Sequence, residues 1–97
     1  MSALMIARIT VKDPGKFQEY LSQTQKVAVP YGAALLHRGR VARSLTGEKE
    51  DHELAVLVKF PNLQEIDEWY SSDAYQPLKA LRDEGADMQM ISYEVLE

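Results

Sequence analysis

The stretch Phe60-Pro61-Asn62-Leu63-Gln64-Glu65 marks the point where a strand gives way to a helix. The run before it, Glu53 to Phe60, is rich in Val and Leu, which favours a strand. Asn62, with Glu65 three residues later, is typical of a helix start in which the two side chains cap one another's backbone. The following apolar side chains have helical spacing: Leu63, Ile66, Trp69 and Tyr70. The stretch therefore predicts a strand, a capped helix and an aromatic cluster.

Upstream, the sequence predicts another strand and helix. Leu4 to Thr10 is a short apolar run interrupted by Arg8, and it predicts a strand that ends at the turn signal Asp13-Pro14-Gly15. Asp13 and Pro14 suit the N-cap and first position of a helix. One face of that helix is apolar: Phe17, Tyr20, Leu21, Thr24, Val27 and Ala28. Pro30 and Gly32 are expected to end it.

The middle of the chain predicts a β-hairpin. Ala33 to Leu45 is expected to be a second strand, although Ala34-Leu35-Leu36 alone could equally be helical. The polar run 46–51 predicts the loop, and Glu53 to Phe60 the returning strand.

Downstream, Ser71-Ser72-Asp73 should interrupt the helical region, and a second piece should start at Asp73 or Pro77 and end at Gly85. Met88 to Val95 predicts a fourth strand. The order β-α-β-β-α-β is the ferredoxin-like arrangement, an α+β fold with a four-stranded antiparallel sheet.

Length and composition limit the possible classes of function. The chain has 97 residues, so we expect a single domain over 1–97 that would gain stability from a partner subunit. The net charge of −4, with interleaved signs, argues against nucleic acid as a partner. Cysteine is absent, so sulfur-ligated metals and thiolate nucleophiles are excluded. The first residues lack a signal-peptide pattern and no run is long enough to cross a membrane, which predicts a cytoplasmic protein without a membrane partner.

Strand alternation predicts two different sheet faces. Because helices can cover only one face, the other would carry Ile6 and Leu57 together with Arg8 and Lys59. Leu36 and Arg38 join that face if the second strand keeps the matching alternation. This mixture of apolar and charged residues suits a face packed on a second copy around a partly polar cavity.

Several segments, in this order and spacing, resemble the family of domain of unknown function 1330. These are Asp13-Pro14, Tyr20, Tyr31-Gly32, Leu36, Arg38-Gly39, Val56, Phe60-Pro61 and Trp69 to Tyr75. The resemblance implies a homodimeric α/β barrel in which two four-stranded sheets face one another. Two departures concern the pocket, because Ala33 stands where the family often has a second Gly, and Arg8 and Lys59 stand where many relatives have acids. If Arg8 and Lys59 line the cavity, it is more basic here than in those relatives.

Three cations are candidates to bind a carboxylate or phosphate: Arg8, Arg38 and Lys59. Alternatively, they form structural ion pairs with Glu94 or with an acid of a partner subunit. Tyr31, beside Gly32, is a candidate for the pocket mouth. Trp69 and Tyr75 are expected to be core anchors rather than a wall for a planar ligand.

His37 could act as a general base only if its strand turned it toward the cavity, and Arg38 would then turn away. His52 is expected to be solvated at the end of the loop. Neither histidine has a metal-ligand spacing, so we expect no metal and no cofactor.

The leading hypothesis is a homodimer that binds a small anionic organic molecule near Arg8, Tyr31, Arg38, Lys59 and His37. One alternative follows from the wider superfamily, which includes cofactor-free oxygenases and lactone isomerases; Arg38 or Lys59 would then stabilise an oxyanion. A second alternative is a structural or interaction module without a ligand.

Overall fold

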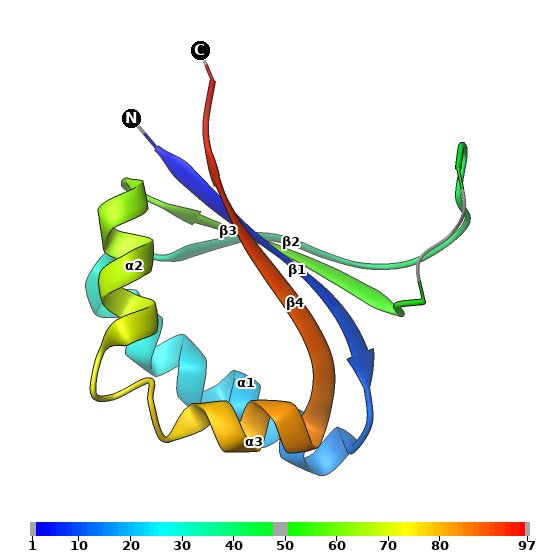
Figure 1. Ribbon diagram of the computed structural model, residues 1–97, viewed down its shortest axis with the longest axis horizontal. Helices are drawn as coiled ribbons and strands as arrows, with labels where there is room; N and C mark the ends of the chain where they lie inside the picture. Colours follow the sequence, from blue (N-terminus) through cyan, green and yellow to red (C-terminus); the bar gives the residue numbers. More distant parts are fainter. Residues whose placement is uncertain (1, 48–50, 97) are drawn as a thin grey trace.

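The protein folds as a four-stranded antiparallel sheet with helices on one side, as Figure 1 shows. The structure is a computed structural model and describes residues 2–47 and 51–96. Its strands are β1 (Ala3–Val11), β2 (Ala34–Arg40), β3 (Leu54–Phe60) and β4 (Ala86–Glu94). Its helices are α1 (Pro14–Ala28), the short 3-10 helix η1 (Val29–Tyr31), α2 (Leu63–Ser71) and α3 (Leu78–Gly85). The predicted α+β class and ferredoxin-like order are confirmed, with the second helical region divided into α2 and α3.

The helix starts follow from local capping chemistry. Asp13 precedes Pro14, and its carboxylate accepts a hydrogen bond from the backbone N–H of Lys16 at 3.2 Å. The Asn62 side chain likewise accepts from the backbone N–H of Glu65 at 2.8 Å. These two predicted N-caps therefore occupy their expected places, whereas the third helix begins after Pro77 rather than at Asp73.

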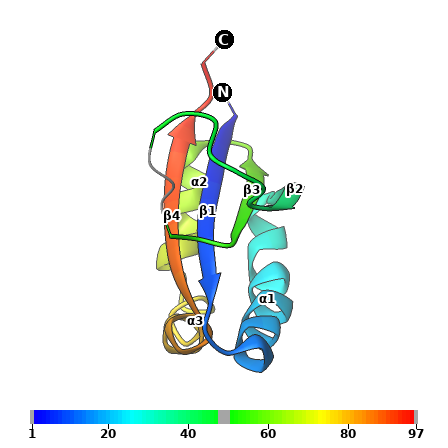
Figure 2. The ribbon, with the colours of Figure 1, turned by 90° about the vertical axis from the view of Figure 1, so that its right-hand side faces the viewer.

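The strand order across the sheet is β2-β3-β1-β4, as Figure 2 shows. All three neighbouring pairs are antiparallel. The strand order leaves β2 and β4 as the two edges of the sheet. β2 ends at Arg40, short of the predicted Leu45, and the predicted loop 46–51 includes residues 48–50, which lie outside the described part of the chain. Residues 41–47 and 51–53 extend away from the helices (Figure 1).

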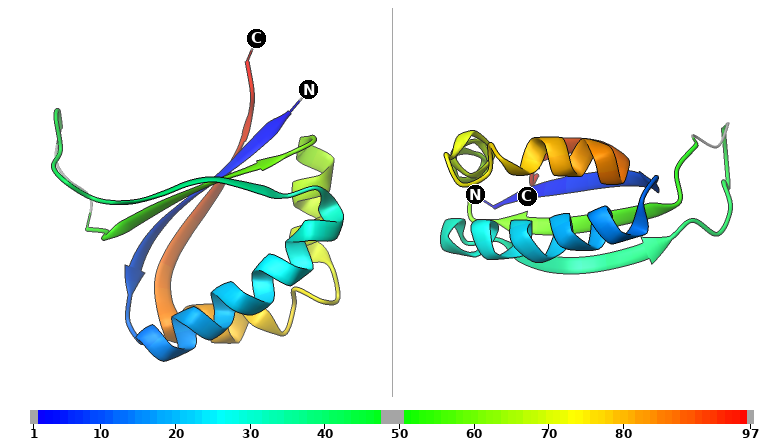
Figure 3. Two further views of the ribbon diagram at one scale, coloured as in Figure 1. Left: turned by 180° about the vertical axis from the view of Figure 1, so that it is seen from behind. Right: turned by 90° about the horizontal axis from the view of Figure 1, so that it is seen from below.

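The core lies between the sheet and the helices. Alternate residues of β1 are buried there, namely Ala3, Met5, Ala7 and Ile9, while α1 and α3 lie side by side (Figure 3). Trp69 and Tyr75 are also buried and pack in the aromatic cluster, which confirms their role as core anchors. We call this side of the sheet the helix face and the opposite side the open face.

The open face has a largely apolar centre. Cross-strand pairing places Ile6 of β1 opposite Leu57 of β3 and Ile91 of β4, and Leu4 opposite Tyr93. No helix of the described residues covers these side chains, and Ile91 and Tyr93 remain 37% and 41% exposed. A surface of this kind favours association.

Candidate functional site

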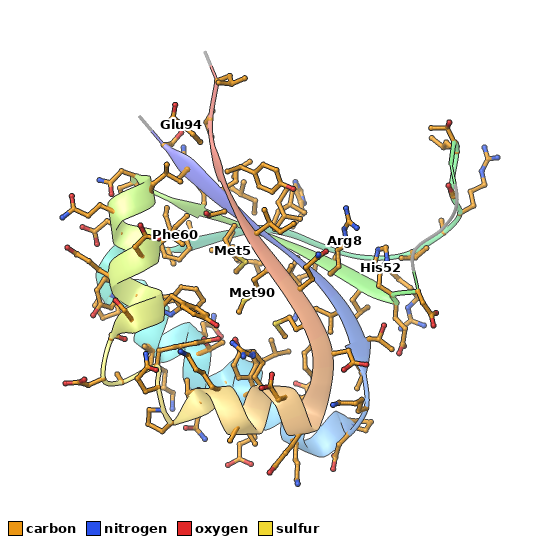
Figure 4. All side chains as sticks on the ribbon, in the orientation of Figure 1. Met5, Arg8, His52, Phe60, Met90 and Glu94 are labelled. Carbon is orange, nitrogen blue, oxygen red and sulfur yellow. The ribbon has the colours of Figure 1, made fainter. Side chains whose placement is uncertain are left out.

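A depression of about 430 Å³ lies on the open face at the end of the sheet near the β2–β3 connection. Its lining residues come from β1, β4 and the segment before β3: Arg8, Thr10, Asp51, His52, Asp87, Met88 and Gln89. Figure 4 shows Arg8 and His52 near one another on the side away from the helices. The volume falls within the range of small-molecule sites.

Arg8 reaches the depression because of its position in β1. It lies opposite Ala55 of β3 and Gln89 of β4, and its buried neighbours in β1 point to the helix face. A central strand therefore presents a cation on the face that the helices leave open.

Three hydrogen bonds hold the segment 51–53 against the end of β1. The Thr10 hydroxyl donates to the Asp51 carbonyl at 3.0 Å, and the Glu53 N–H donates to the Ile9 carbonyl at 2.8 Å. The Glu53 carboxylate also accepts from the Val11 N–H at 3.1 Å. These contacts bring His52, which is far from Arg8 in the sequence, into the wall of the same depression.

The charge in the depression is mixed. Arg8 supplies a permanent positive charge, whereas Asp51 and Asp87 supply two negative charges. Lys12 offsets part of the Asp87 charge through an exposed ion pair of 3.5 Å. A guanidinium binds a carboxylate through charge-assisted hydrogen bonds, and Thr10 and Gln89 add neutral hydrogen-bonding groups. Among residues 2–47 and 51–96, no cluster of three His, Asp or Glu side chains could hold a metal ion.

The predicted site residues do not all gather at one place. Lys59 lies opposite Leu4, four residues along β1 from Arg8, which corresponds to roughly 13 Å along the strand. Tyr31 packs against the core on the helix face. Tyr31 therefore does not line the depression at Arg8, and its place at the mouth of a ligand pocket stays a prediction. Lys59 shares the face of Arg8 but not its depression.

A bulge in β2 decides which of its residues face the open side. Leu35 lies opposite Val58, and His37 lies opposite Leu57, so Leu36 is an extra residue in the pairing. His37 consequently shares the open face with Leu57, while Arg38 lies opposite Val56 on the helix face. The orientation in which His37 turns toward the open face is the one found, and Arg38 does not join Arg8.

His52 was expected to be solvated, but it is half-buried in the wall of the depression. Its distance along the chain from Arg8 hid this proximity. One indirect signal was present in the sequence, the predicted hairpin. If its second strand pairs with the first strand of the chain, the residues just before that second strand lie beside the end of the first strand.

A second polar cluster lies within the helical layer. The hydroxyls of Tyr20 and Tyr75 are 2.9 Å apart, and Arg82 donates to the Tyr75 and Tyr70 hydroxyls at 3.1 Å each. Burial raises the pKa of both Tyr20 and Tyr75. Burial alone would lower the pKa of Arg82, but hydrogen bonds to Asp83, Tyr70 and Tyr75 raise it. The cluster therefore holds neutral phenols against a charged guanidinium, a role the sequence did not reveal for Arg82.

The sequence profile described as Domain of unknown function (DUF1330) matches residues 2–96. The chain belongs to the DUF1330 family. No curated protein matches it. The described residues of this DUF1330 protein include no helix with the length and apolar character needed to cross a membrane.

Solved structures similar to this DUF1330 chain share its fold at low identity. A protein of unknown function from Rhodopseudomonas palustris has 14% identity and a TM-score of 0.83, over 99% of this chain and 83% of that one. A dimeric ferredoxin-like protein of unknown function from Jannaschia sp. CCS1 has 15% identity and a TM-score of 0.66, over 98% and 100%. SnoaB, a cofactor-independent oxygenase from Streptomyces nogalater, has 8% identity and a TM-score of 0.71, over 99% and 94%.

Proposed function

We propose that this protein is a homodimer that packs its open face on a second copy and binds a small organic acid at Arg8. The observation that carries the proposal is the position of Arg8 in a depression of about 430 Å³ on the face its own helices leave uncovered. The dimeric ferredoxin-like protein from Jannaschia supports the assembly by its fold and its description.

The apolar centre of the open face supports burial against another subunit. Burying Ile6, Leu57, Ile91 and Tyr93 would remove apolar surface from water, at about 25 cal/mol per Å². The depression lies at one end of this surface, because Arg8 is two residues from Ile6 along β1. Dimerisation would therefore shield the site from water and strengthen its polar contacts.

The charges of the lining residues favour a particular kind of acid. Arg8 would bind a carboxylate, while Asp51 and Asp87 would repel a multiply charged anion. His52, Thr10 and Gln89 could hydrogen-bond to other polar groups of the ligand. We therefore propose a singly charged carboxylate in preference to a phosphate ester.

Native mass spectrometry of the protein purified gently from its own source tests the assembly and any retained molecule together. We expect a dimer that carries the additional mass of an organic acid. A monomer would overturn the proposed assembly.

Calorimetric titration with benzoate tests the ligand class, with benzamide as the uncharged analogue and inorganic phosphate as the multiply charged one. We expect benzoate to bind more tightly than either. Arg8→Gln should weaken benzoate binding roughly tenfold or more, because a hydrogen bond between charged groups is worth about 1.5 to 3 kcal/mol. Lys59→Gln is the matched control and should bind normally. Equal affinity of wild type and Arg8→Gln for benzoate would overturn the assigned site.

A further inference from the structure

The charges that line the depression on the open face are separated along the sheet. Arg8 lies opposite Gln89, and Thr10, two residues further along β1, lies opposite Asp87. One cross-strand pair therefore carries a guanidinium, and the next pair on the same face carries a carboxylate. Residues two positions apart in a strand share a face and lie roughly 7 Å from one another.

The second acid of the depression lies at the same end as Asp87. The Thr10 hydroxyl donates to the backbone carbonyl of Asp51 at 3.0 Å, which holds Asp51 beside the pair formed by Thr10 and Asp87. Both acids line the depression together with Arg8. The depression therefore has a positive end at Arg8 and a negative end at Thr10.

A ligand with a carboxylate alone would suit only one of these ends. When its carboxylate lies at Arg8, Asp51 and Asp87 face the rest of the ligand, and like charges in a sheltered site disfavour one another. A protonated amine at the negative end would replace this repulsion by attraction. An ammonium group has three N–H donors, and its hydrogen bonds to carboxylates are charge-assisted.

We infer that the depression selects a zwitterion with separated charges, an amino acid whose carboxylate lies at Arg8 and whose ammonium group lies at Asp51 and Asp87. This inference rests on the carboxylate site at Arg8 proposed above and adds the other end of the ligand. In an α-amino acid both charged groups are attached to one carbon atom, which is too close to reach both ends. A chain of several carbon atoms or a benzene ring between the groups spans the distance.

Lys12 competes with the ligand for Asp87. Its ammonium nitrogen lies 3.5 Å from an Asp87 carboxylate oxygen, and the two side chains are 47% and 77% exposed. Exposed ion pairs contribute little free energy, so a ligand can compete with Lys12. The same pair shows that an ammonium group can approach the Asp87 carboxylate.

Calorimetric titration at neutral pH with three carboxylates tests the inference. The first, 4-(aminomethyl)benzoate, carries its charges at opposite ends. The second, 4-ethylbenzoate, has nearly the same shape but no ammonium group, and phenylglycine carries both charges on one carbon atom. We expect 4-(aminomethyl)benzoate to bind roughly fivefold or more tightly than either, which is the upper end of what one exposed ion pair contributes.

Two variants should change this preference in opposite directions. Asp87→Asn keeps the size of the side chain but removes its charge, so it should lower the preference for 4-(aminomethyl)benzoate over 4-ethylbenzoate roughly twofold or more. Lys12→Gln removes the competing ammonium group and should raise the preference. Asp67→Asn is the matched control, because Asp67 is an exposed acid of α2 on the other side of the sheet, and it should leave the preference unchanged.

The outcomes separate the two proposals. If 4-(aminomethyl)benzoate and 4-ethylbenzoate bind equally well and Arg8→Gln weakens both, the carboxylate site stands and the zwitterion is overturned. An unchanged preference in Asp87→Asn, or phenylglycine binding as tight as that of 4-(aminomethyl)benzoate, would also overturn the zwitterion. If the wild type binds none of the three, or if Arg8→Gln binds them as well as the wild type does, both proposals are overturned. Circular dichroism would establish that each variant is folded.

Discussion

The hydroxyl oxygens of Tyr20 and Tyr75 lie 2.9 Å apart inside the helical layer, although the two residues belong to different parts of the chain. Arg82 donates to the Tyr75 hydroxyl, and either of the two tyrosine hydroxyls could donate to the other. The hydrogen-bond chain therefore joins α1 to α3 through the segment between α2 and α3. Buried polar groups connected in this way help to specify one packing of the helices.

Tyr75→Phe should destabilise the protein more than Tyr20→Phe. The first change leaves both a buried hydroxyl and a guanidinium N–H without this partner, and each such loss costs about 1 to 3 kcal/mol. The second removes only the hydrogen bond between the two hydroxyls. Urea unfolding at a fixed protein concentration measures both free energies, and the double variant gives their coupling. Equal effects without coupling would contradict the network.

The same tyrosines predict a loss of stability in alkali. Burial raises the pKa of Tyr20 and of Tyr75 above the ordinary phenol value of 10.0. Between the unfolded and folded pKa values the unfolded chain binds fewer protons, so stability present below pH 10 decreases as the pH rises further. Thermal unfolding from pH 8 to 11 should show this decrease, and Tyr20→Phe should make it less steep.

Gly32→Ala should be strongly destabilising. Gly32 has a φ of 82°, and a Cβ there would lie 2.6 Å from Cγ of Pro61. Gly47→Ala is a matched control, because Gly47 has a φ of 75° but nothing within 4 Å of the added atom. Backbone strain alone costs about 1 to 2 kcal/mol. Denaturant unfolding should therefore show a larger loss for Gly32→Ala, and equal losses would contradict the close approach to Pro61.

Asn62→Ala should lower stability by about 1 kcal/mol, because the first turn of α2 loses its cap. Asn62→Asp should preserve stability, since a carboxylate also accepts from the Glu65 N–H and interacts favourably with the helix N-terminus. Chemical unfolding of the three proteins provides the comparison. A loss in Asn62→Asp as large as in Asn62→Ala would show that another role of Asn62 dominates.

Local sequence patterns predicted the elements well because their causes are local. Asp13 and Asn62 are followed by helices, and the β1 alternation places Arg8 opposite the core. Contacts between residues far apart in the chain were harder to predict. The approach of His52 to Arg8 depends on hydrogen bonds between the end of β1 and the segment before β3, which no spacing within either segment encodes.

The polar cluster was missed for a related reason. Arg82 lies in a short helix whose sequence reads as ordinary surface, and only the packing of α3 beside α1 brings it to Tyr75. Alternation alone did not determine on which sheet face Arg38 lies, because one extra residue in a strand moves every later side chain to the opposite face. The pairing of β2 with β3, rather than any strand propensity, places Arg38 on the helix face.

The bulge at Leu36 decides which side chain of β2 joins the open face. If Leu36 itself paired with Leu57, every later residue of β2 would move by one pairing position, so that Arg38 rather than His37 would lie on that face. An imidazole would then be exchanged for a permanent positive charge without any substitution. A change of register in this one edge strand would therefore change the charge of the open face while the sequence stays the same.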